Sequence, residues 1–184
     1  MEKSEMEVLT LGAGCFWCIE VLMEEIQGIS KVTSGYSGGQ TPSPTYADVC
    51  SGQTGHAEVV QIEYDPGTIS TTDIMRIFFD IHDPTTLNSQ GPDIGTQYRS
   101  VIFFHTEKQK SIANKLIDEL EANKAWKDPI VTQIEPIKEF YAAEDYHHQY
   151  YRRNESQPYC QILIAPKLRK FKKNYHDQIK QLNA

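Results

Sequence analysis

The chain has 184 residues, with 18 lysines and arginines against 25 aspartates and glutamates, which gives a formal net charge of −7. A chain of this length is expected to form one domain with a sizeable core, and its acidic balance argues against nucleic acid or an anionic membrane as the main partner. Residues 1–10 lack the apolar run of a signal peptide, and no later stretch is long and apolar enough to span a membrane. We therefore expect a cytoplasmic protein whose four cysteines do not form a structural disulfide framework.

Predicted strands and helices alternate along the chain, without internal repeats or a linker that would divide domains. In chain order we expect a strand at 6–12, a helix at 15–27, a strand at 32–36, a loop at 37–44, a strand at 57–65, a helix at 70–80, a loop at 82–97, a strand at 101–105, a helix at 107–123, a strand at 130–134, a helix at 142–153, a strand at 159–164 and a basic amphipathic helix at 167–182. This order predicts an α+β fold, a two-layer sandwich with a mixed sheet, in a single domain over residues 1–184.

The sequence Gly14-Cys15-Phe16-Trp17-Cys18 lies where the first predicted strand meets the first predicted helix. Both thiols would fall in the first helical turn, where free backbone N–H groups and the positive end of the dipole favour thiolate over thiol. The thiolate is the reactive form of cysteine, so this placement predicts Cys15 as a nucleophile. The two aromatic rings would form an apolar surface beside its sulfur.

Glu58 stands at the start of a predicted strand, on the same face as Val60, Ile62 and Tyr64. Strand side chains alternate between faces, so this carboxyl is expected on the core side. Burial would raise its pKa and keep it protonated near neutral pH, as a proton donor requires. The alternative is that strand fraying leaves Glu58 at a wet sheet edge.

Two further cysteines stand apart from this pair. Cys160 shares a predicted strand face with Ile162 and Ile164, so it is either a small buried hydrophobe or a redox-active thiol. Cys50 has no spacing signature, and we expect it to be structural or incidental.

Short motifs follow one another in order between residues 14 and 147. They are Gly14-Cys15-Phe16-Trp17, Gly35-Tyr36-Ser37-Gly38-Gly39, Pro44-Thr45-Tyr46, Cys50-Ser51-Gly52-Gln53-Thr54-Gly55-His56-Ala57-Glu58, Asp83-Pro84-Thr85, Gly95-Thr96-Gln97-Tyr98-Arg99-Ser100 and Phe140-Tyr141-Ala142-Ala143-Glu144-Asp145-Tyr146-His147. This series resembles the peptide methionine sulfoxide reductase A family. The resemblance covers about residues 11–160, which places a family-like region at about 8–165 ahead of the basic helix at 167–182.

The resemblance implies roles for individual residues. It makes Cys15 the nucleophile and Glu58 the acid, in agreement with the strand phase of Glu58. The other implied roles are Tyr46 and Tyr98 as phenols that hydrogen-bond the sulfoxide oxygen, Phe16 and Trp17 as the wall that holds the substrate methyl, and Asp93 as a supporting polar residue.

The resemblance also implies a reaction and a fold. A catalytic domain with a ferredoxin-like core would reduce methionine S-sulfoxide, free or in proteins, and so repair oxidised proteins. Thiolate attack would release methionine and leave a sulfenic acid on Cys15. A second thiol would condense with it to a disulfide, which thioredoxin or a similar dithiol would reduce. We expect a monomer without a cofactor, because the redox equivalents reside on sulfur.

Position 18 departs from the commonest pattern of the family, which has glycine there. Cys18 resembles the second thiol of a Cys-x-x-Cys redox pair and would lie one helical turn from Cys15. Tyr159-Cys160 resembles the start of the cysteine-bearing tail that resolves the sulfenic acid in other members, although no glycine-rich segment follows it. We favour Cys18 as the resolving thiol, with Cys160 as the alternative.

Three other functions compete with this prediction. A thiol–disulfide oxidoreductase would use Cys15 and Cys18 but would leave Glu58 without a role. A structural zinc site usually needs two closely spaced ligand pairs, and only this cysteine pair is close, although His147-His148 could supply ligands if they are not simply a polar helix face. The basic run at 167–173 could bind an acidic partner, but such runs usually form a solvated face.

Overall fold

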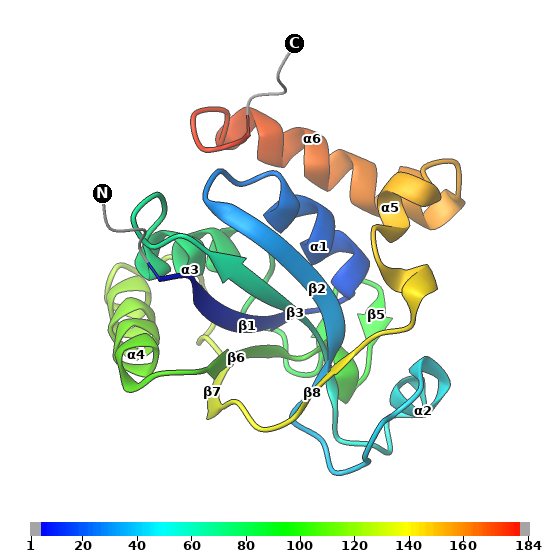
Figure 1. Ribbon diagram of the computed structural model, residues 1–184. Helices are drawn as coiled ribbons and strands as arrows, with labels where there is room; N and C mark the ends of the chain where they lie inside the picture. Colours follow the sequence, from blue (N-terminus) through cyan, green and yellow to red (C-terminus); the bar gives the residue numbers. More distant parts are fainter. Residues whose placement is uncertain (1–4, 181–184) are drawn as a thin grey trace.

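The structure is a computed structural model that describes residues 5–180. A six-stranded sheet in the order β7-β6-β1-β3-β2-β8 forms its centre (Figure 1). The strands are β1 (Glu7–Ala13), β2 (Ile29–Ser37), β3 (Ala57–Tyr64), β6 (Ser100–Phe104), β7 (Gln133–Pro136) and β8 (Phe140–Ala142). Within this sheet β6 and β7 run parallel and the other neighbouring strands run antiparallel. The sheet is therefore mixed, as the sequence predicts.

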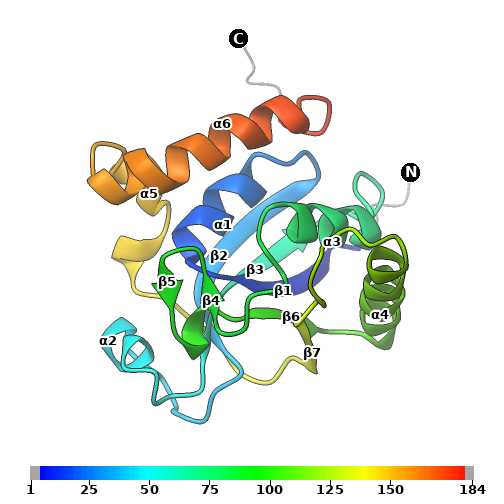
Figure 2. The ribbon, with the colours of Figure 1, turned by 180° about the vertical axis from the view of Figure 1, so that it is seen from behind.

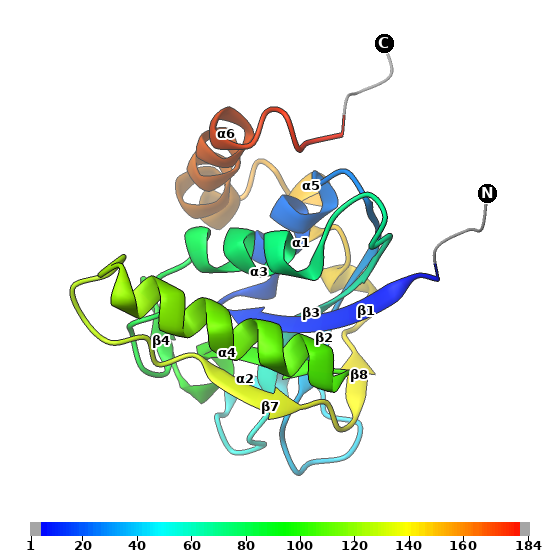
Figure 3. The same cartoon turned by 90° about the vertical axis from the view of Figure 1, so that its left-hand side faces the viewer.

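Helices cover one face of this sheet. The first two are α1 (Phe16–Glu24) and α3 (Thr71–Asp80), with α4 (Glu107–Ala122) beside α3 and α6 (Ala165–Asn174) outside α1 (Figures 1 and 3). The main core lies between the sheet and α1 and α3, and a smaller cluster of Ala57, Val59, Val101 and Phe103 lies on the other face. Alternation along β3 divides its side chains between the two clusters, so the predicted α+β two-layer arrangement is confirmed.

Helices α3 and α4 each begin after a short polar side chain that caps the first helical turn. The Ser70 side chain accepts a hydrogen bond from the backbone N–H of Asp73, and Thr106 does the same for Gln109. Each bond satisfies one N–H that the first helical turn leaves free. The bounds of α3 and α4 therefore lie within one residue of the predicted ones at both ends.

Regular structure occurs in one segment predicted as a loop and in one segment for which no element was predicted. The segment predicted as a loop at 82–97 holds a hairpin of β4 (Ser89–Gln90) and β5 (Asp93–Ile94), which lies in front of the sheet in the reverse view (Figure 2). A short helix, α2 (Tyr46–Cys50), follows the first predicted loop. It begins at a capping box in which Thr45 and Asp48 each bond the other's backbone N–H, a signal that sequence reasoning missed.

The predictions for residues 142–164 are wrong in two places. The helix expected at 142–153 is broken into the 3₁₀ turn Asp145–His147 and α5 (Tyr150–Arg153), with Gln149 in the left-handed region at φ +54° between them. The strand expected at 159–164 is instead the π-helix Cys160–Ile164, which runs into α6. In the first of these places, the backbone N–H of Gln149 bonds the side chain of Glu20 on α1 rather than continuing a helical ladder, which local periodicity does not reveal.

The basic terminal helix is shorter than the predicted 167–182. Helix α6 ends at Asn174 and buries Leu168 and Phe171. The following residues turn back, so that Gln178 accepts a backbone hydrogen bond from Gln27 after α1. Residues 181 and 182 of the predicted helix lie outside the described residues. No helix within residues 5–180 has the length and apolar character needed to cross a membrane.

Candidate active site

Cys15 lies at the junction of β1 and α1 and is the residue that precedes the first helical turn. The turn before it requires glycine, because Gly14 has φ +88° and a Cβ there would come within 2.7 Å of the Gln90 side chain. Cys15 is only 8% exposed. The sequence therefore holds this thiol at a fixed place between the end of the sheet and the β4–β5 hairpin.

Glu58 lies at the start of β3 with its carboxyl directed at the beginning of α1. The backbone N–H of Phe16 donates a hydrogen bond of 3.1 Å to Glu58 Oε2, and the side chain is 1% exposed. Burial raises the pKa of Glu58 to about 8, so this carboxyl is protonated at neutral pH. The predicted core-facing phase is confirmed, and the alternative of a wet sheet edge is wrong.

The predicted thiolate character of Cys15 is not what the structure shows. Burial, the hydrogen bond with Cys18 and the charge of Glu58 raise the pKa of Cys15 well above its usual range. The hydrogen bond with Cys15 lowers the pKa of Cys18, with a smaller contribution from the charge of Lys167. Desolvation outweighs the helix N-terminus at Cys15, so Cys15 rests as a thiol beside the more acidic thiol of Cys18.

Tyr159 joins the thiols to Asp93, and sequence reasoning missed this link. The Tyr159 hydroxyl donates a hydrogen bond of 2.8 Å to Asp93 Oδ2 and also bonds Cys15 and Cys18. Asp93, on β5, therefore contacts the site through Tyr159, and its charge contributes to the raised pKa of Glu58. The sequence drew attention to Cys160, the cysteine after Tyr159, and not to the tyrosine itself.

Two phenols reach the same region from different elements. Tyr46 is the first residue of α2, and Tyr98 ends the 3₁₀ helix Thr96–Tyr98. Burial raises the pKa of both tyrosines, and the nearby charge of Glu58 raises them further, so each keeps its proton and can donate it in a hydrogen bond. Tyr46 also hydrogen-bonds Cys50, which is exposed at the end of α2.

The predicted aromatic wall is more than the pair Phe16 and Trp17. Phe16 is fully buried, whereas Trp17 is partly exposed. The Tyr150 ring stacks on Trp17 with centroids 3.7 Å apart and planes 7° apart. Trp17 Nε1 donates a hydrogen bond of 3.0 Å to His147 Nδ1. The interpretation of His147 as part of a polar helix face is wrong, because this ring is fully buried among aromatic side chains.

A buried carboxyl on α1 fastens the segment that carries Tyr150. Glu20 is 2% exposed, and its Oε2 accepts a hydrogen bond of 3.0 Å from the backbone N–H of Gln149. The backbone of Tyr150 also bonds Glu20, and burial raises the pKa of Glu20 to about 7. Periodicity alone did not single out Glu20, because it lies in the middle of an otherwise apolar helix.

Cys18 and Cys160 lie near the nucleophile in different ways. Cys18, in the first turn of α1, is 7% exposed and hydrogen-bonds Cys15. Cys160 is fully buried at the start of the π-helix, close enough to Cys18 for its charge to raise the pKa of Cys160, after the larger effect of burial. Both candidate resolving thiols therefore lie on the same side of the site.

Within residues 5–180, no group of three or more histidine, cysteine or acidic side chains is arranged to hold a metal ion. One ring nitrogen of each histidine in the pair is already engaged, because His147 Nδ1 accepts from Trp17 and His148 Nε2 bonds the Ala143 carbonyl.

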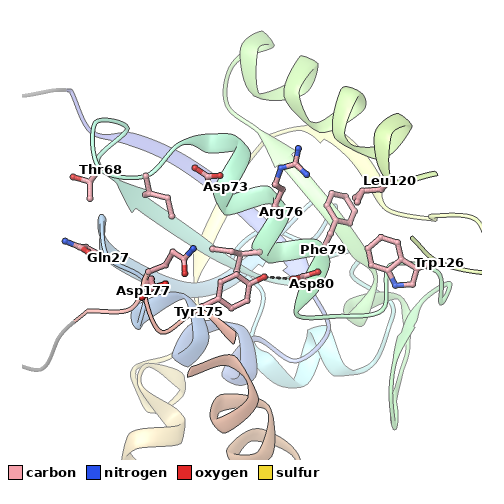
Figure 4. A pocket seen from close by; sticks show the side chains of 13 residues that line it. Gln27, Thr68, Asp73, Arg76, Phe79, Asp80, Leu120, Trp126, Tyr175 and Asp177 are labelled. Atoms are coloured by element: carbon pink, nitrogen blue, oxygen red, sulfur yellow. Dashed lines mark hydrogen bonds between the residues drawn. The ribbon is translucent and has the colours of Figure 1, made fainter. Parts of the chain in front are cut away.

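A separate cavity of about 560 Å³ lies between α3, the end of α4 and the segment after α6 (Figure 4). Tyr175 hydrogen-bonds Asp80 in it, and Phe79 and Trp126 supply apolar surface. None of the residues that line this cavity is a cysteine, so it holds no thiol for sulfur chemistry.

Paired thiols beside a protonated carboxyl and two phenols define a thiol-dependent reductase. The family model described as "Peptide methionine sulfoxide reductase" matches residues 7–180. The chain is 53% identical over 175 residues to the peptide methionine sulfoxide reductase MsrA of Saccharolobus solfataricus. The aligned residues cover 95% of this chain and 98% of that protein. The chain therefore belongs to the peptide methionine sulfoxide reductase family, and it reduces methionine sulfoxide.

Solved structures agree with this assignment. Mxr1 from Saccharomyces cerevisiae in reduced form is 40% identical, with a TM-score of 0.79 over 85% of this chain and 90% of that one. Mxr1 in complex with Trx2 is 30% identical, with a TM-score of 0.57 over 79% of this chain and 85% of that one. Membership of this family argues against a pure thiol–disulfide oxidoreductase. That function would also leave the Glu58 carboxyl and both phenols without a role.

Proposed function

We propose that this chain reduces methionine S-sulfoxide with Cys15 as the nucleophile and Glu58 as the acid. The single observation that carries the proposal is the buried, protonated Glu58 carboxyl held on the Phe16 N–H, one residue from Cys15. A sulfoxide oxygen is a poor leaving group until it is protonated, so an acid fixed beside a thiol supplies what the reaction needs. Tyr46 and Tyr98 then donate hydrogen bonds to the same oxygen.

The resting protonation states fit a concerted exchange of protons. Glu58 gives its proton to the sulfoxide oxygen, and the Cys15 proton passes to the resulting carboxylate as Cys15 Sγ attacks the substrate sulfur. This attack forms a bond between Cys15 Sγ and the substrate sulfur. Glu58, reprotonated by Cys15, gives its proton to the same oxygen, and the sulfur–oxygen bond breaks as water leaves. A water molecule then attacks Cys15 Sγ and returns a proton to Glu58, which breaks the bond to the substrate sulfur, releases methionine and leaves a sulfenic acid on Cys15. The substrate sulfur gains two electrons and Cys15 Sγ loses two. A thiol that stays protonated until substrate binds is also protected from adventitious oxidation.

Substrate binding is assigned to the aromatic wall. Trp17, the partly exposed ring, supplies the apolar contact for the substrate methyl, and the fully buried Phe16 backs it. Asp93 acts as a supporting residue through its hydrogen bond from Tyr159, which also bonds Cys15.

Cys18 is the proposed resolving thiol. Its hydrogen bond with Cys15 keeps it beside the proposed nucleophile, and its lowered pKa favours the thiolate that attacks a sulfenic acid. This attack expels water and forms a Cys15–Cys18 disulfide. Cys160, which is fully buried at the start of the π-helix, is the alternative.

Reduction of the disulfide falls to a dithiol protein of the thioredoxin class, as the solved complex of yeast Mxr1 with Trx2 supports. Free and protein-bound methionine S-sulfoxide are both proposed as substrates, in the repair of oxidised proteins. The reaction needs no cofactor beyond these thiols. A cytoplasmic location suits four free cysteines, two of which must be reduced again after each turnover.

The proposed architecture is one catalytic domain with a ferredoxin-like core and a monomeric state. The order β1-α1-β2-β3-α3-β6, with neighbouring strands in the order β6-β1-β3-β2 and all antiparallel, supports this core. The family-like region at about 8–165 and the basic helix share one hydrophobic core through Leu168 and Phe171, which supports a single domain.

The test is release of methionine in a single turnover, with separated S and R epimers and no reductant. We expect one methionine per chain from the S epimer, none from the R epimer, and the loss of two thiols per chain. Release from the R epimer, or release with no change in thiol content, would contradict the proposed mechanism.

A further inference from the structure

His147 occupies a position in the aromatic wall that the proposed chemistry does not use. Its ring is fully buried, with centroids 5.1 Å from Phe16, 5.8 Å from Trp17 and 4.4 Å from Tyr46. The centroids of those three rings are 6.5 Å apart for Phe16 and Trp17, 6.4 Å for Phe16 and Tyr46, and 6.4 Å for Trp17 and Tyr46. They form a nearly equilateral triangle, and the His147 ring backs it at similar distances from all three corners.

The hydrogen bond from Trp17 fixes the chemical state of His147. An indole N–H can only donate, so His147 Nδ1 must be the acceptor and carry no proton. The other ring nitrogen, Nε2, is buried and has no hydrogen-bond partner among the described residues, and it lies 4.0 Å from Glu144 Oε2. The His147 ring therefore makes one directional bond, the hydrogen bond from Trp17 Nε1, and the same bond fixes the position of the indole N–H.

Trp17 is fastened on two sides. Tyr150 covers one face of the indole at a centroid distance of 3.7 Å, and His147 holds its N–H. Stacking fixes the plane of a ring but lets it slide, whereas the hydrogen bond sets its rotation within that plane. The separation of Trp17 from Tyr46 therefore depends on His147.

We propose that His147 is a positioning residue that sets the width of the aromatic triangle and so restricts the alkyl group on the substrate sulfur to methyl. This inference rests on the proposed role of Trp17 as the methyl-binding wall. A single methylene in an apolar pocket changes specificity by about 10- to 200-fold, so a wall held to within a fraction of an ångström can exclude an ethyl group.

The experiment compares kcat/KM for the S-sulfoxides of methionine and ethionine, with a small dithiol as reductant. In His147→Phe, which keeps an aromatic ring but loses the acceptor, we expect the methyl-to-ethyl ratio to fall about 3- to 10-fold, mainly through KM for the methyl substrate. His147→Asn keeps an acceptor oxygen near the place of Nδ1 and should restore most of the ratio. His176→Asn changes an exposed histidine and should leave the ratio unchanged.

A second variant guards against misfolding of the histidine substitutions. Site-specific replacement of Trp17 by 3-benzothienylalanine removes only the N–H donor and should lower the ratio as much as His147→Phe. The inference is overturned if the ratio stays at the wild-type value in either variant, or if His147→Asn loses as much as His147→Phe. A wild-type protein that reduces neither sulfoxide would contradict the proposed function instead.

Discussion

Residues 7–24 and residues 140–164 border the same site but are held in place differently. The first region is one strand and one helix joined at Gly14, and its backbone bonds are those of regular structure. The second is a short strand, a 3₁₀ turn, one left-handed residue, a one-turn helix and a π-helix. It is tied to the first region by side-chain bonds from Glu20 and Trp17. The regular region carries both thiols of the proposed oxidation, Cys15 and Cys18, and the irregular region packs against it.

The two candidate resolving thiols belong to these two regions. Cys18 stands in the first turn of α1 and contacts Cys15 without any change of fold. Cys160 starts a π-helix, a helical irregularity that often occurs at functional sites. The contrast suggests that the first region can complete oxidation by itself, whereas use of Cys160 would require the second region to move.

The largest effect should come from removal of the nucleophile in the first region. Cys15→Ser is expected to lower methionine release by about a thousandfold or more, because it removes the proposed nucleophile. Cys160→Ser, in the second region, should release one methionine per chain in a single turnover at the wild-type rate. Quenched-flow measurement of methionine checks both. If Cys15→Ser and Cys160→Ser lowered methionine release by similar factors, the two regions would not differ in their roles as proposed.

Loss of the acid should have the next largest effect. Glu58→Gln is expected to lower the single-turnover rate by about 10²- to 10⁴-fold, the range of general acid catalysis. Because the pKa of Glu58 is raised to about 8 and the protonated form is active, the wild-type rate should fall as the pH rises through about 8. The rate of the Glu58→Gln variant should not fall over this pH interval. A wild-type rate that rises through this interval would contradict the role of Glu58 as the acid.

The tie between the regions should affect stability rather than chemistry. Glu20→Ala leaves the N–H groups of Gln149 and Tyr150 without their buried acceptor, and it should lower the free energy of unfolding by about 1 to 3 kcal/mol. Urea unfolding measures the change. Hydrogen exchange should show the loss of protection concentrated in residues 149–153. Uniform loss of protection across β1 and α1 would show that the two regions do not separate.

Glu20→Gln is the matched control, since it keeps an acceptor oxygen. The folded-state pKa of Glu20, about 7, lies above its usual value of 4.5, so the folded protein binds this proton more tightly than the unfolded chain does. The contribution of Glu20 to stability is therefore present below pH 4.5 and is lost as the pH rises towards 7. This loss should be absent in the Gln variant.

The smallest effect should come from the surface ion pairs between the regions. Arg152 on α5 bonds Glu24 and Glu25, each at 3.0 Å, and its side chain is 46% exposed. Arg152→Ala should cost about 0.5 kcal/mol, and the difference should shrink in high salt. Urea unfolding at two salt concentrations would check this. If Arg152→Ala lowered the free energy of unfolding as much as Glu20→Ala, the surface ion pairs would connect the two regions as strongly as the buried Glu20 carboxyl does.

The same contrast explains what the sequence could predict. The strands at β1, β3 and β6 and the helices α3 and α4 follow local periodicity and caps, so their existence and approximate bounds were predictable. The strand phase of β3 even located Glu58 on the buried face. The helix expected at 142–153 was wrong because Gln149 and Tyr150 bond Glu20, more than a hundred residues earlier, and no local pattern encodes that partner.

Site prediction was incomplete for related reasons. The motif series brought Cys15, Glu58, Tyr46 and Tyr98 to attention, and the structure brings them to one region. The thiolate expected at Cys15 required only a helix terminus, but burial by distant elements has the larger effect on its pKa. The links Tyr159–Asp93 and Trp17–His147 join side chains across more than sixty residues. Such pairs become visible only when the chain is folded.

The central claim is that the first region contains both thiols needed for one complete oxidation. The most direct test is to treat the reduced protein with one equivalent of methionine S-sulfoxide, trap free thiols and map the disulfide by peptide mass spectrometry. We predict a Cys15–Cys18 bond in the wild type and in Cys160→Ser, and a persistent Cys15 sulfenic acid in Cys18→Ser. A Cys15–Cys160 bond in the wild type, with normal disulfide formation in Cys18→Ser, would contradict the claim.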